Sequence, residues 1–461
     1  MSLASELEAD SIIVDATKAY TFSGTGSIVG NTVLVKRGTG NLTIKTDNTY
    51  TGGTRISGGA VIVTSLSNAN QAVGNLGGVV SSNQKFVMEN GGELRTTAAV
   101  TQGSPMMMLG PEGGVVQNAN DFILNKPVSG KKLTKKGNGW MKLNVANGGL
   151  DTLVVGAGTV QCINANVPAK NVVYTGGTLR ENTSTSYSIN VPQGKSGTWY
   201  MANRSTYTNK ITGEGTLTIY CVTEKGSNYY ATRTPVQCNF NDFTGTIKPT
   251  SSVDDPALLR FTLNTAGGCP NGTFDLASAV EVQNSGKTFT IGKVTGTGSL
   301  GGSCTFSNGT SVGANTWKVG NATNFTWDGR VTSNANFQKI GEGKMTTKGA
   351  WTTTGNVAVN EGELAITSSS SLGKGTLTVA KGATLSGVTS NNSTLENSSY
   401  TINGTMQVGS TKNSTTGAIT LNDKNITFSR DSYFIIGASR CASASFNGCT
   451  ALRGVNRITM N

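Results

Sequence analysis

Few residues of this sequence carry chemistry, and the acidic ones are scattered. Histidine is absent, which excludes Ser-His-Asp and Cys-His nucleophiles, HExxH metalloproteases and every His-ligated metal. An enzyme acting on polysaccharides needs clustered carboxylates, with Arg or Lys for acidic sugars. The candidate catalytic acids are the adjacent Asp254 and Asp255, and the pair Glu361 and Glu363. The scatter of the other acids favours a chain without a catalytic centre.

Two segments are candidates for ligand binding. Trp317, Phe325 and Trp327 lie in ANTWKVGNATNFTWDGR and would form a sugar-stacking platform if they face outward. Packing in the core or at a corner is the alternative. In the basic run GKKLTKKG, alternation along a strand places Lys132 and Lys136 on one face and Lys135 on the other, an arrangement suited to an anionic polymer. A solvated strand that resists edge pairing is the alternative.

Seven cysteines are present, none of them in a C-x-x-C pair that would indicate a zinc or redox site. Cys221 and Cys238 bracket one loop-like segment and Cys441 and Cys449 another, so each pair is a candidate disulfide. Free, buried cysteines are the alternative. Because the number is odd, at least one thiol is unpaired within the chain, and Cys162 is the expected one.

No cofactor is expected. The letters GTGSLG at residues 296–301 match a dinucleotide fingerprint, but they continue into GSCTFSNGTS rather than a helix. The net charge of +12 attracts anionic partners such as acidic glycans or lipopolysaccharide, and solubility explains it equally well. No nucleic acid partner is expected.

Short alternating runs predict a chain that is nearly all β. NLTIKT, AVIVTS, KFVME, TLVVG, TLTIYC and TLTVA each have period-2 alternation and are rich in β-branched residues. No segment has helical periodicity over 11 or more residues. Charged residues make up only 13%, so Ser, Thr, Asn and Gly must cover the surface.

Glycine patterns repeat along these strands. The element G-x-G-x-apolar, in which an apolar residue lies two positions after the second glycine, occurs seven times, beginning at Gly24, Gly38, Gly137, Gly213, Gly296, Gly341 and Gly373. A lysine precedes three copies by two positions: Lys36, Lys135 and Lys339. A second element, G-x-hydrophobic, recurs, for example at Gly59, Gly158 and Gly362. Related elements return at intervals far shorter than a β-sandwich domain, so the pattern predicts a parallel β-solenoid with Gly and Asn at its corners.

Residues 24–63 carry a family resemblance. The order Lys36, Gly38, Gly40, Leu42, then NTYTGGT at residues 48–54, then Ile56, Gly59 and Val63 resembles the autotransporter-associated β-strand repeat of bacterial surface proteins. Residues 133–163 and 337–387 are weaker copies without the NTYTGGT block. The resemblance implies a right-handed parallel β-helix that is exported to the cell surface, and it implies packing of Tyr50 at a coil corner. No C-terminal translocator barrel follows in this sequence.

These features predict one elongated all-β repeat domain over residues 11–461, after a lead at residues 1–10, with loop excursions near 221–238 and 441–449. The expected function is that of an extracellular or outer-surface adhesin or structural passenger that binds a glycan or host matrix, is delivered by outer-membrane export machinery and is monomeric. The alternative is a polysaccharide-acting glycosidase or lyase, or an accessory region of one.

Overall fold

The computed structural model is built from β-strands. It describes the chain except residues 68–72, 79–84, 104–105, 146–148, 164–166, 184–185, 202–205, 222, 226–229, 233–235, 252–258, 303–312, 368–370, 388–392, 409–418, 437–438, 441–451 and 461. The described residues form 49 strands and no helix, and they contain no helix long and apolar enough to cross a membrane. The all-β prediction is therefore confirmed.

The chain divides into two compact units, one of Met1–Ser205 with Gly215–Thr218 and the other of Thr206–Glu214 with Ile219–Asn461. The strands of the first unit are β1 (Ser2–Leu3), β2 (Ser11–Asp15), β3 (Tyr20–Gly24), β4 (Val33–Arg37), β5 (Leu42–Ile44), β6 (Thr54–Ile56), β7 (Ala60–Val63), β8 (Lys85–Met88), β9 (Gly92–Thr96), β10 (Val100–Gln102), β11 (Met106–Leu109), β12 (Gly114–Asn118), β13 (Phe122–Leu124), β14 (Val128–Lys136), β15 (Trp140–Leu143), β16 (Leu150–Val155), β17 (Thr159–Cys162), β18 (Ala169–Tyr174), β19 (Thr178–Glu181), β20 (Ser188–Val191) and β21 (Ser196–Met201).

The second unit contains β22 (Lys210–Gly213), β24 (Thr223–Lys225), β25 (Tyr230–Thr232), β26 (Thr246–Ser251), β27 (Leu259–Leu263), β28 (Gly267–Leu276), β29 (Val280–Asn284), β30 (Thr288–Gly296), β31 (Ser299–Leu300), β32 (Thr316–Val319), β33 (Phe325–Trp327), β34 (Arg330–Val331), β35 (Asn336–Lys339), β36 (Lys344–Thr347), β37 (Ala350–Trp351), β38 (Val357–Val359), β39 (Glu363–Ile366), β40 (Ser371–Leu372), β41 (Leu377–Val379), β42 (Thr384–Gly387), β43 (Ser393–Thr394), β44 (Tyr400–Ile402), β45 (Thr405–Val408), β46 (Ile419–Phe428), β47 (Tyr433–Ile436), β48 (Ser439–Arg440) and β49 (Leu452–Met460). Residues of β23 (Thr216–Cys221) fall in both units.

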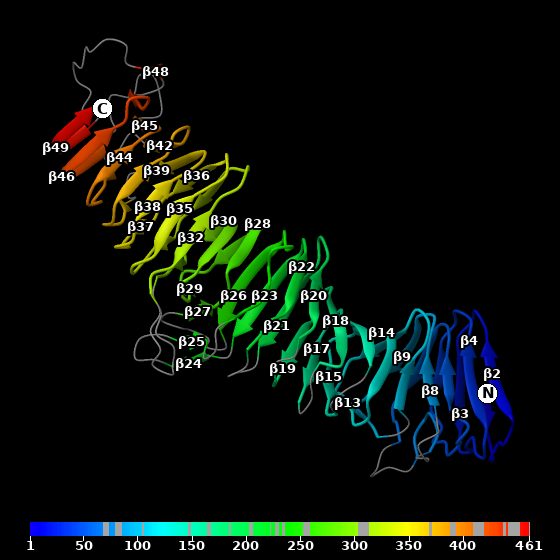
Figure 1. Cartoon of the computed structure of the whole chain (residues 1–461). Helices are drawn as coiled ribbons and strands as arrows, with labels where there is room; N and C mark the ends of the chain where they lie inside the picture. The colour runs from blue at the N-terminus through cyan, green and yellow to red at the C-terminus, as the bar shows by residue number, and fades with distance from the viewer. Residues whose placement is uncertain are drawn as a thin grey trace. The chain divides into compact units, whose positions relative to one another are not determined.

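In the first unit, successive coils stack as parallel ladders (Figure 1). One ladder runs β2-β4-β6-β8-β11-β14-β16-β18-β20, a second runs β1-β3-β5-β7-β9-β12-β14, and a third runs β10-β13-β15-β17-β19-β21. The long strand β14 belongs to two ladders because Val128–Gly130 pair with β11 while Leu133–Lys136 pair with β12. This parallel stacking confirms the β-solenoid. Residues 1–10 include β1, which pairs with β3.

The second unit is built in the same way. A ladder runs from β26 through β28, β30, β32, β35, β38, β41, β44 and β46 to β49, and two others run β25-β27-β29-β31-β34 and β33-β36-β39-β42-β45-β47. Among the described residues of this unit, β24–β25 and β47–β48 pair antiparallel. Asparagine side chains join successive coils: Asn356 N–H donates to Asn336 Oδ1 (2.9 Å) and Thr376 N–H donates to Asn356 Oδ1 (3.1 Å).

Aligned apolar rows form the core of each unit. In the first unit one row contains Leu133, Leu153, Val172 and Ile189, all of them fully buried. Burial of such a side chain contributes roughly 1.5–3 kcal/mol. Because strand residues alternate between the two faces, the residues between these positions point outward. The alternation read from the sequence therefore fixes which side chains are available to a ligand.

Three lysines interrupt the apolar rows, and they are the lysines that precede G-x-G. Lys36, Lys135 and Lys339 are at most 1% exposed. Lys135 stacks between Val116 and Val155, so its aliphatic stem continues the row. Its ammonium donates to the carbonyls of Lys136 (2.9 Å), Gly137 (2.6 Å) and Ala157 (3.1 Å). Three donors thus meet three acceptors at a coil corner.

The other two lysines repeat this carbonyl cage. Lys339 donates to Ile340 O (2.9 Å), Gly341 O (2.7 Å) and Glu361 O (3.1 Å). Lys36 donates to the carbonyls of Arg37, Gly38 and Gly58. In each case the third carbonyl belongs to the next coil and precedes a glycine 23 positions after the lysine: Gly59, Gly158 or Gly362. The G-x-G element and the G-x-hydrophobic element therefore form the same corner on two successive coils.

Amine labelling is expected to distinguish the caged lysines from their neighbours. Burial lowers the pKa of Lys135 and of Lys339 to about 8, which would make both amines more reactive than an ordinary lysine if reagent reached them. Because both are fully buried, we expect no modification in the folded protein during a short exposure to an amine-reactive ester at pH 8. Lys136, which is exposed, should be modified. Peptide mass spectrometry measures this, with urea-unfolded protein as control. Equal labelling of Lys135 and Lys136 in the folded protein would contradict the cage.

Buried polar groups also order the NTYTGGT block. Asn48 Oδ1 accepts from Ile28 N–H (2.9 Å), while Nδ2 donates to Asn75 O (2.8 Å) and Thr46 O (3.0 Å). Tyr50 is fully buried and its hydroxyl hydrogen-bonds Thr54 Oγ1 at 2.7 Å. Asn48 therefore joins three backbone segments, and Tyr50 packs with its ring fully buried.

Glu181 is an unusual core residue of the first unit. It is 3% exposed and lies beside Cys162 in the ladder of β17 and β19. Trp199 Nε1 donates to Glu181 Oε1 at 2.6 Å and the Tyr187 hydroxyl donates to the same oxygen. Among the described residues Oε2 has no hydrogen-bond partner. Burial raises the pKa of Glu181 to about 7, against the effect of the two hydrogen bonds.

Candidate ligand-binding site

The outer face of β14, β16 and β18 carries most of the charge of these strands. Lys132 and Lys136 point outward and Lys135 points inward, as the alternation predicted. Lys131 and Lys170 are exposed on the same strands. Asp151 accepts hydrogen bonds from Lys170 (3.0 Å) and Lys131 (3.2 Å). These two hydrogen bonds hold the pKa of Asp151 below its usual range, and the one from Lys170 has the larger effect. Lys132 and Lys136 have no ion-pair partner among the described residues.

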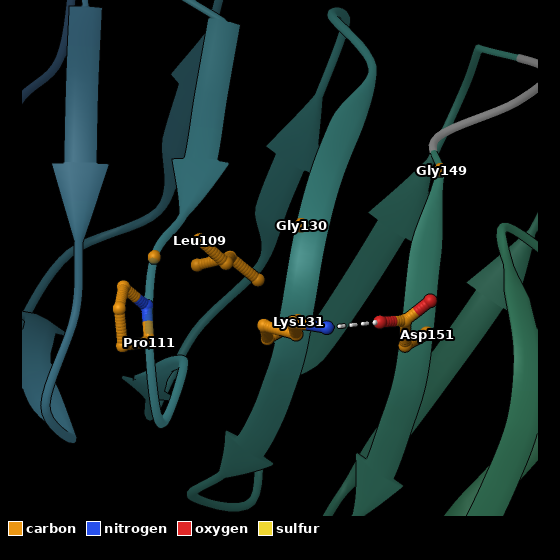
Figure 2. A pocket seen from close by; sticks show the side chains of 7 residues that line it. Leu109, Pro111, Gly130, Lys131, Gly149 and Asp151 are labelled. Atoms are coloured by element: carbon orange, nitrogen blue, oxygen red, sulfur yellow. Dashed lines mark hydrogen bonds and ion pairs between the residues drawn. The ribbon is translucent and has the colours of Figure 1, made fainter.

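We call the outward surface that carries Lys131, Lys132, Lys136 and Lys170 the lysine face. An open pocket of about 410 Å³ lies on it, beside Lys131. Figure 2 shows it between the end of β11 and the starts of β14 and β16, with the Lys131–Asp151 ion pair at its edge. Leu109 and Pro111 provide apolar lining, and Gly110, Gly130 and Gly149 contribute no side chains. Gly130 has φ +117° and a Cβ there would lie 1.9 Å from Leu109 O. The position therefore requires glycine, and the backbone alone forms this part of the pocket wall. The pocket suits part of a polymer more than a buried small molecule.

A second outward surface lies on β15, β17, β19 and β21. The register aligns Lys142, Gln161, Arg180 and Tyr200 in one row. The guanidinium carbon of Arg180 lies 4.1 Å from the Tyr200 ring centroid and 5.3 Å from that of Trp140. We call Trp140, Arg180 and Tyr200 the arginine clamp. Sequence reasoning missed it, although the signal was present: in GNGWM the core residue is Met141, so Trp140 must face outward.

For two of the three candidate platform residues the alternative, packing in the core, is the one that holds. Trp317 and Trp327 are fully buried, and Phe325 is half-buried. Trp317 occupies a row between Phe289 and Phe337, and its Nε1 donates to Gly301 O at 2.8 Å. Trp327 packs 6.0 Å from Trp351, centroid to centroid. Both indoles fill the inward ladder, where their large apolar area is best used, so they cannot stack on a sugar at the surface.

The candidate acids in the described part of the chain have structural partners. Glu361 Oε2 accepts from Gly341 N–H at 2.7 Å, beside the Lys339 cage. Glu363 pairs with Lys344 at 2.7 Å and accepts from Ser386 Oγ. Asp254 and Asp255 lie outside the described residues. The described residues contain no group of three or more His, Cys, Asp or Glu that could hold a metal ion.

One further acid, Glu281, lies in a polar cluster of the second unit. It is 6% exposed. Gln283 Nε2 donates to its Oε1 at 2.7 Å, Thr332 Oγ1 donates to its Oε2 at 2.7 Å, and Arg260 Nε lies 3.5 Å away. These contacts engage both carboxylate oxygens, so Glu281 links its own strand to neighbouring segments. Sequence reasoning did not single it out, because its partners come from β27, from β29 and from Thr332, which directly follows β34.

The cysteine pairing predicted for Cys221 and Cys238 is not formed. Both are free and buried, as are Cys162 and Cys269. Cys221 ends the inward row of β23, and Cys238 Sγ points to Tyr207 O at 3.6 Å. Each thiol fills a core position of its own coil, which is the reason that the two do not meet. Cys162 is free as expected. Cys441 and Cys449 lie outside the described residues.

Comparison with known proteins places these features in a family context. Residues 34–63 match the family model described as Passenger-associated-transport-repeat, and this segment contains the Lys36 cage, Asn48 and Tyr50. The chain is 26% identical over 262 residues to the adhesin BmaC autotransporter of Brucella suis biovar 1 (strain 1330). That alignment covers 49% of this chain and 7% of the relative. No solved structure matches the chain. The matched repeat and the partial likeness to an autotransporter adhesin support an autotransporter passenger-type repeat protein, and they indicate export and display at the outer cell surface.

Proposed function

We propose that this passenger is an adhesin that binds an anionic glycan or an anionic polymer of the host matrix along the lysine face. The observation that carries the proposal is the set of outward lysines on β14 and β18, beside an open pocket. In these strands Lys131, Lys132, Lys136 and Lys170 face solvent, and Asp151 of β16 is the acidic residue among them. Asp151 pairs with Lys131 and Lys170, and Lys132 and Lys136 have no carboxylate partner among the described residues. Four ammonium groups beside one carboxylate attract a polyanion and speed its association.

Two further points support adhesion. The relative named above is itself called an adhesin. The candidate acids at Glu361 and Glu363 are engaged in structural contacts, and binding without turnover needs no free carboxylate. An outward face on a rigid ladder also presents charges at a regular spacing of about 4.8 Å from strand to strand, which suits a repeating polymer.

Charge reversal on the lysine face is expected to weaken this binding. In the double variant Lys132→Glu with Lys136→Glu, we expect affinity for immobilised heparin or hyaluronan at about 0.15 M salt to fall at least about tenfold. The reason is that two positive charges are replaced by two negative ones on the surface that attracts the polyanion. The matched control is Lys18→Glu with Lys45→Glu, two exposed lysines elsewhere in the same unit. Surface plasmon resonance over a salt series measures both.

Three outcomes would contradict the proposal. The wild-type chain would bind neither polymer, or it would bind a neutral chitin oligosaccharide equally well, or both double variants would lose the same affinity. The last result would assign binding to the net charge of +12 instead of to this face. Size-exclusion chromatography of the recovered glycan tests for cleavage, which is expected to be absent.

A further inference from the structure

The arginine clamp holds a charged group in a fixed position on the outside of the first unit. The strand register places Arg180 directly beside Tyr200 and one strand beyond Gln161. The guanidinium lies over the Tyr200 ring and near the Trp140 ring, at 4.1 Å and 5.3 Å from the centroids. Cation–π contacts of this kind contribute about 0.5–1 kcal/mol or more each at exposed sites. They reduce the freedom that Arg180 would lose on binding a ligand.

The charge of Arg180 is not compensated within the described residues. Lys142, at one end of the row, is paired with Asp121 at 2.6 Å. No carboxylate of the described residues pairs with Arg180. Stacking on aromatic rings uses the faces of a guanidinium and leaves its N–H edges available. Those edges match a planar oxyanion, to which arginine donates two parallel hydrogen bonds.

The surroundings of the clamp suit a sugar. Trp140 is half-exposed and adds a flat apolar surface. The adjacent outward row consists of Thr159, Thr178 and Thr198, aligned with Trp140 by the ladder register. Their hydroxyls and the Gln161 amide are short donors and acceptors on the same face. Val160, Leu179 and Trp199 lie beneath them, fully buried, and hold the strands rigid.

We infer that the arginine clamp is a binding subsite for an acidic sugar, in which Arg180 binds the carboxylate of a uronate and Trp140 contacts the sugar ring. The corner Gly137–Gly139 joins the end of β14 to the start of β15, so Lys136 and Trp140 flank the same turn of the coil. A polyanion lying on the lysine face could continue to the clamp. The inference rests on the proposed function and adds a recognition element that lysines, as point charges, do not provide.

The test compares Arg180→Lys with Arg37→Lys, a matched control at an exposed arginine of β4. Isothermal titration uses a hexauronate, its methyl ester and a sulfated hexasaccharide. For Arg180→Lys we expect about a tenfold loss of affinity for the hexauronate, since the charge remains and the fork is lost. Arg37→Lys should bind as the wild type does. The methyl ester should bind the wild type at least about tenfold more weakly than the free acid. Tighter binding of the sulfated sugar than of the uronate would overturn the carboxylate assignment.

A second variant separates recognition from folding. Trp140→Phe keeps an aromatic ring beneath Arg180, so its unfolding midpoint should match that of the wild type while affinity for the hexauronate falls. Unchanged affinity in Arg180→Lys, together with loss in the Lys132→Glu and Lys136→Glu double variant, would overturn this inference and leave the proposed function standing. Absence of binding to any of the anionic glycans by the wild-type protein would overturn both.

Discussion

Replacing Gly158 by alanine is expected to lower the free energy of unfolding of the first unit by about 3 kcal/mol or more. Gly158 has φ +62°, where an L-residue costs roughly 1–2 kcal/mol. An added Cβ would also lie 2.5 Å from Gly139 O and 2.6 Å from Gly137 O. Gly137 O is one of the three carbonyls that receive the Lys135 ammonium. The methyl group must therefore displace a corner that already holds a buried charge, and overpacking adds its own cost.

Gly194→Ala is the matched control for this prediction. Gly194 has a similar φ, +68°, but a Cβ there would meet no atom within 4 Å. Only the backbone preference should be lost, so we expect a decrease of about 1 kcal/mol. Urea unfolding followed by circular dichroism measures both variants. If Gly158→Ala were as mild as Gly194→Ala, the corner would be able to relax and the cage would not restrict residue 158.

Replacing Glu181 by glutamine is expected to remove a pH dependence of stability that is large for one residue. The pKa of Glu181 is raised by burial to about 7, from an ordinary value of 4.5. Between these values the folded protein binds the proton more tightly than the unfolded chain. The stability from this carboxyl is therefore fully present below pH 4.5 and is lost as pH rises to about 7. At about 1.4 kcal/mol for each pH unit, the loss amounts to about 3 kcal/mol.

The difference between the variant and the wild type isolates this group from other titrations. We expect Glu181→Gln to gain stability over the wild type between pH 5 and pH 8, because glutamine can still accept from Tyr187 and Trp199 and does not bury a charge. Thermal unfolding at several pH values measures the gain. Glu342→Gln, at an exposed glutamate, should show none. A difference between Glu181→Gln and the wild type that does not change with pH would show that Glu181 titrates near its ordinary value.

Much of the fold could be predicted from the sequence, because the alternation of apolar and polar residues along a strand shows which side chains face the core and which face solvent. All six of the runs used to predict strands contain one, for example AVIV at β7 and TLTIYC at β23. The glycines marked the corners correctly. The repeated lysine was noticed, and alternation placed Lys135 on the face opposite Lys132 and Lys136, but the role of its amine was not predicted. Only the coil geometry shows three carbonyls converging on its amine.

The binding surfaces were predicted less completely, for a physical reason. Lys132 and Lys136 follow from alternation within one strand, which is local information. The arginine clamp depends on the ladder β15-β17-β19-β21, in which Trp140, Arg180 and Tyr200 are up to 60 positions apart in the sequence. For Trp317 and Trp327 the sequence left an outward platform and packing in the core both open, because aromatic density alone does not tell the inward rows from the outward ones.

The asparagine links between successive coils have a consequence for how the chain acquires its structure. Asn336, Asn356 and Thr376 are joined in steps of 20 residues, and no step needs a partner from a remote part of the sequence. Segments with such short-range contacts can grow from a nucleus by nearest-neighbour addition. A polypeptide delivered end first can therefore mature progressively, each newly arrived turn templated by the one already in place.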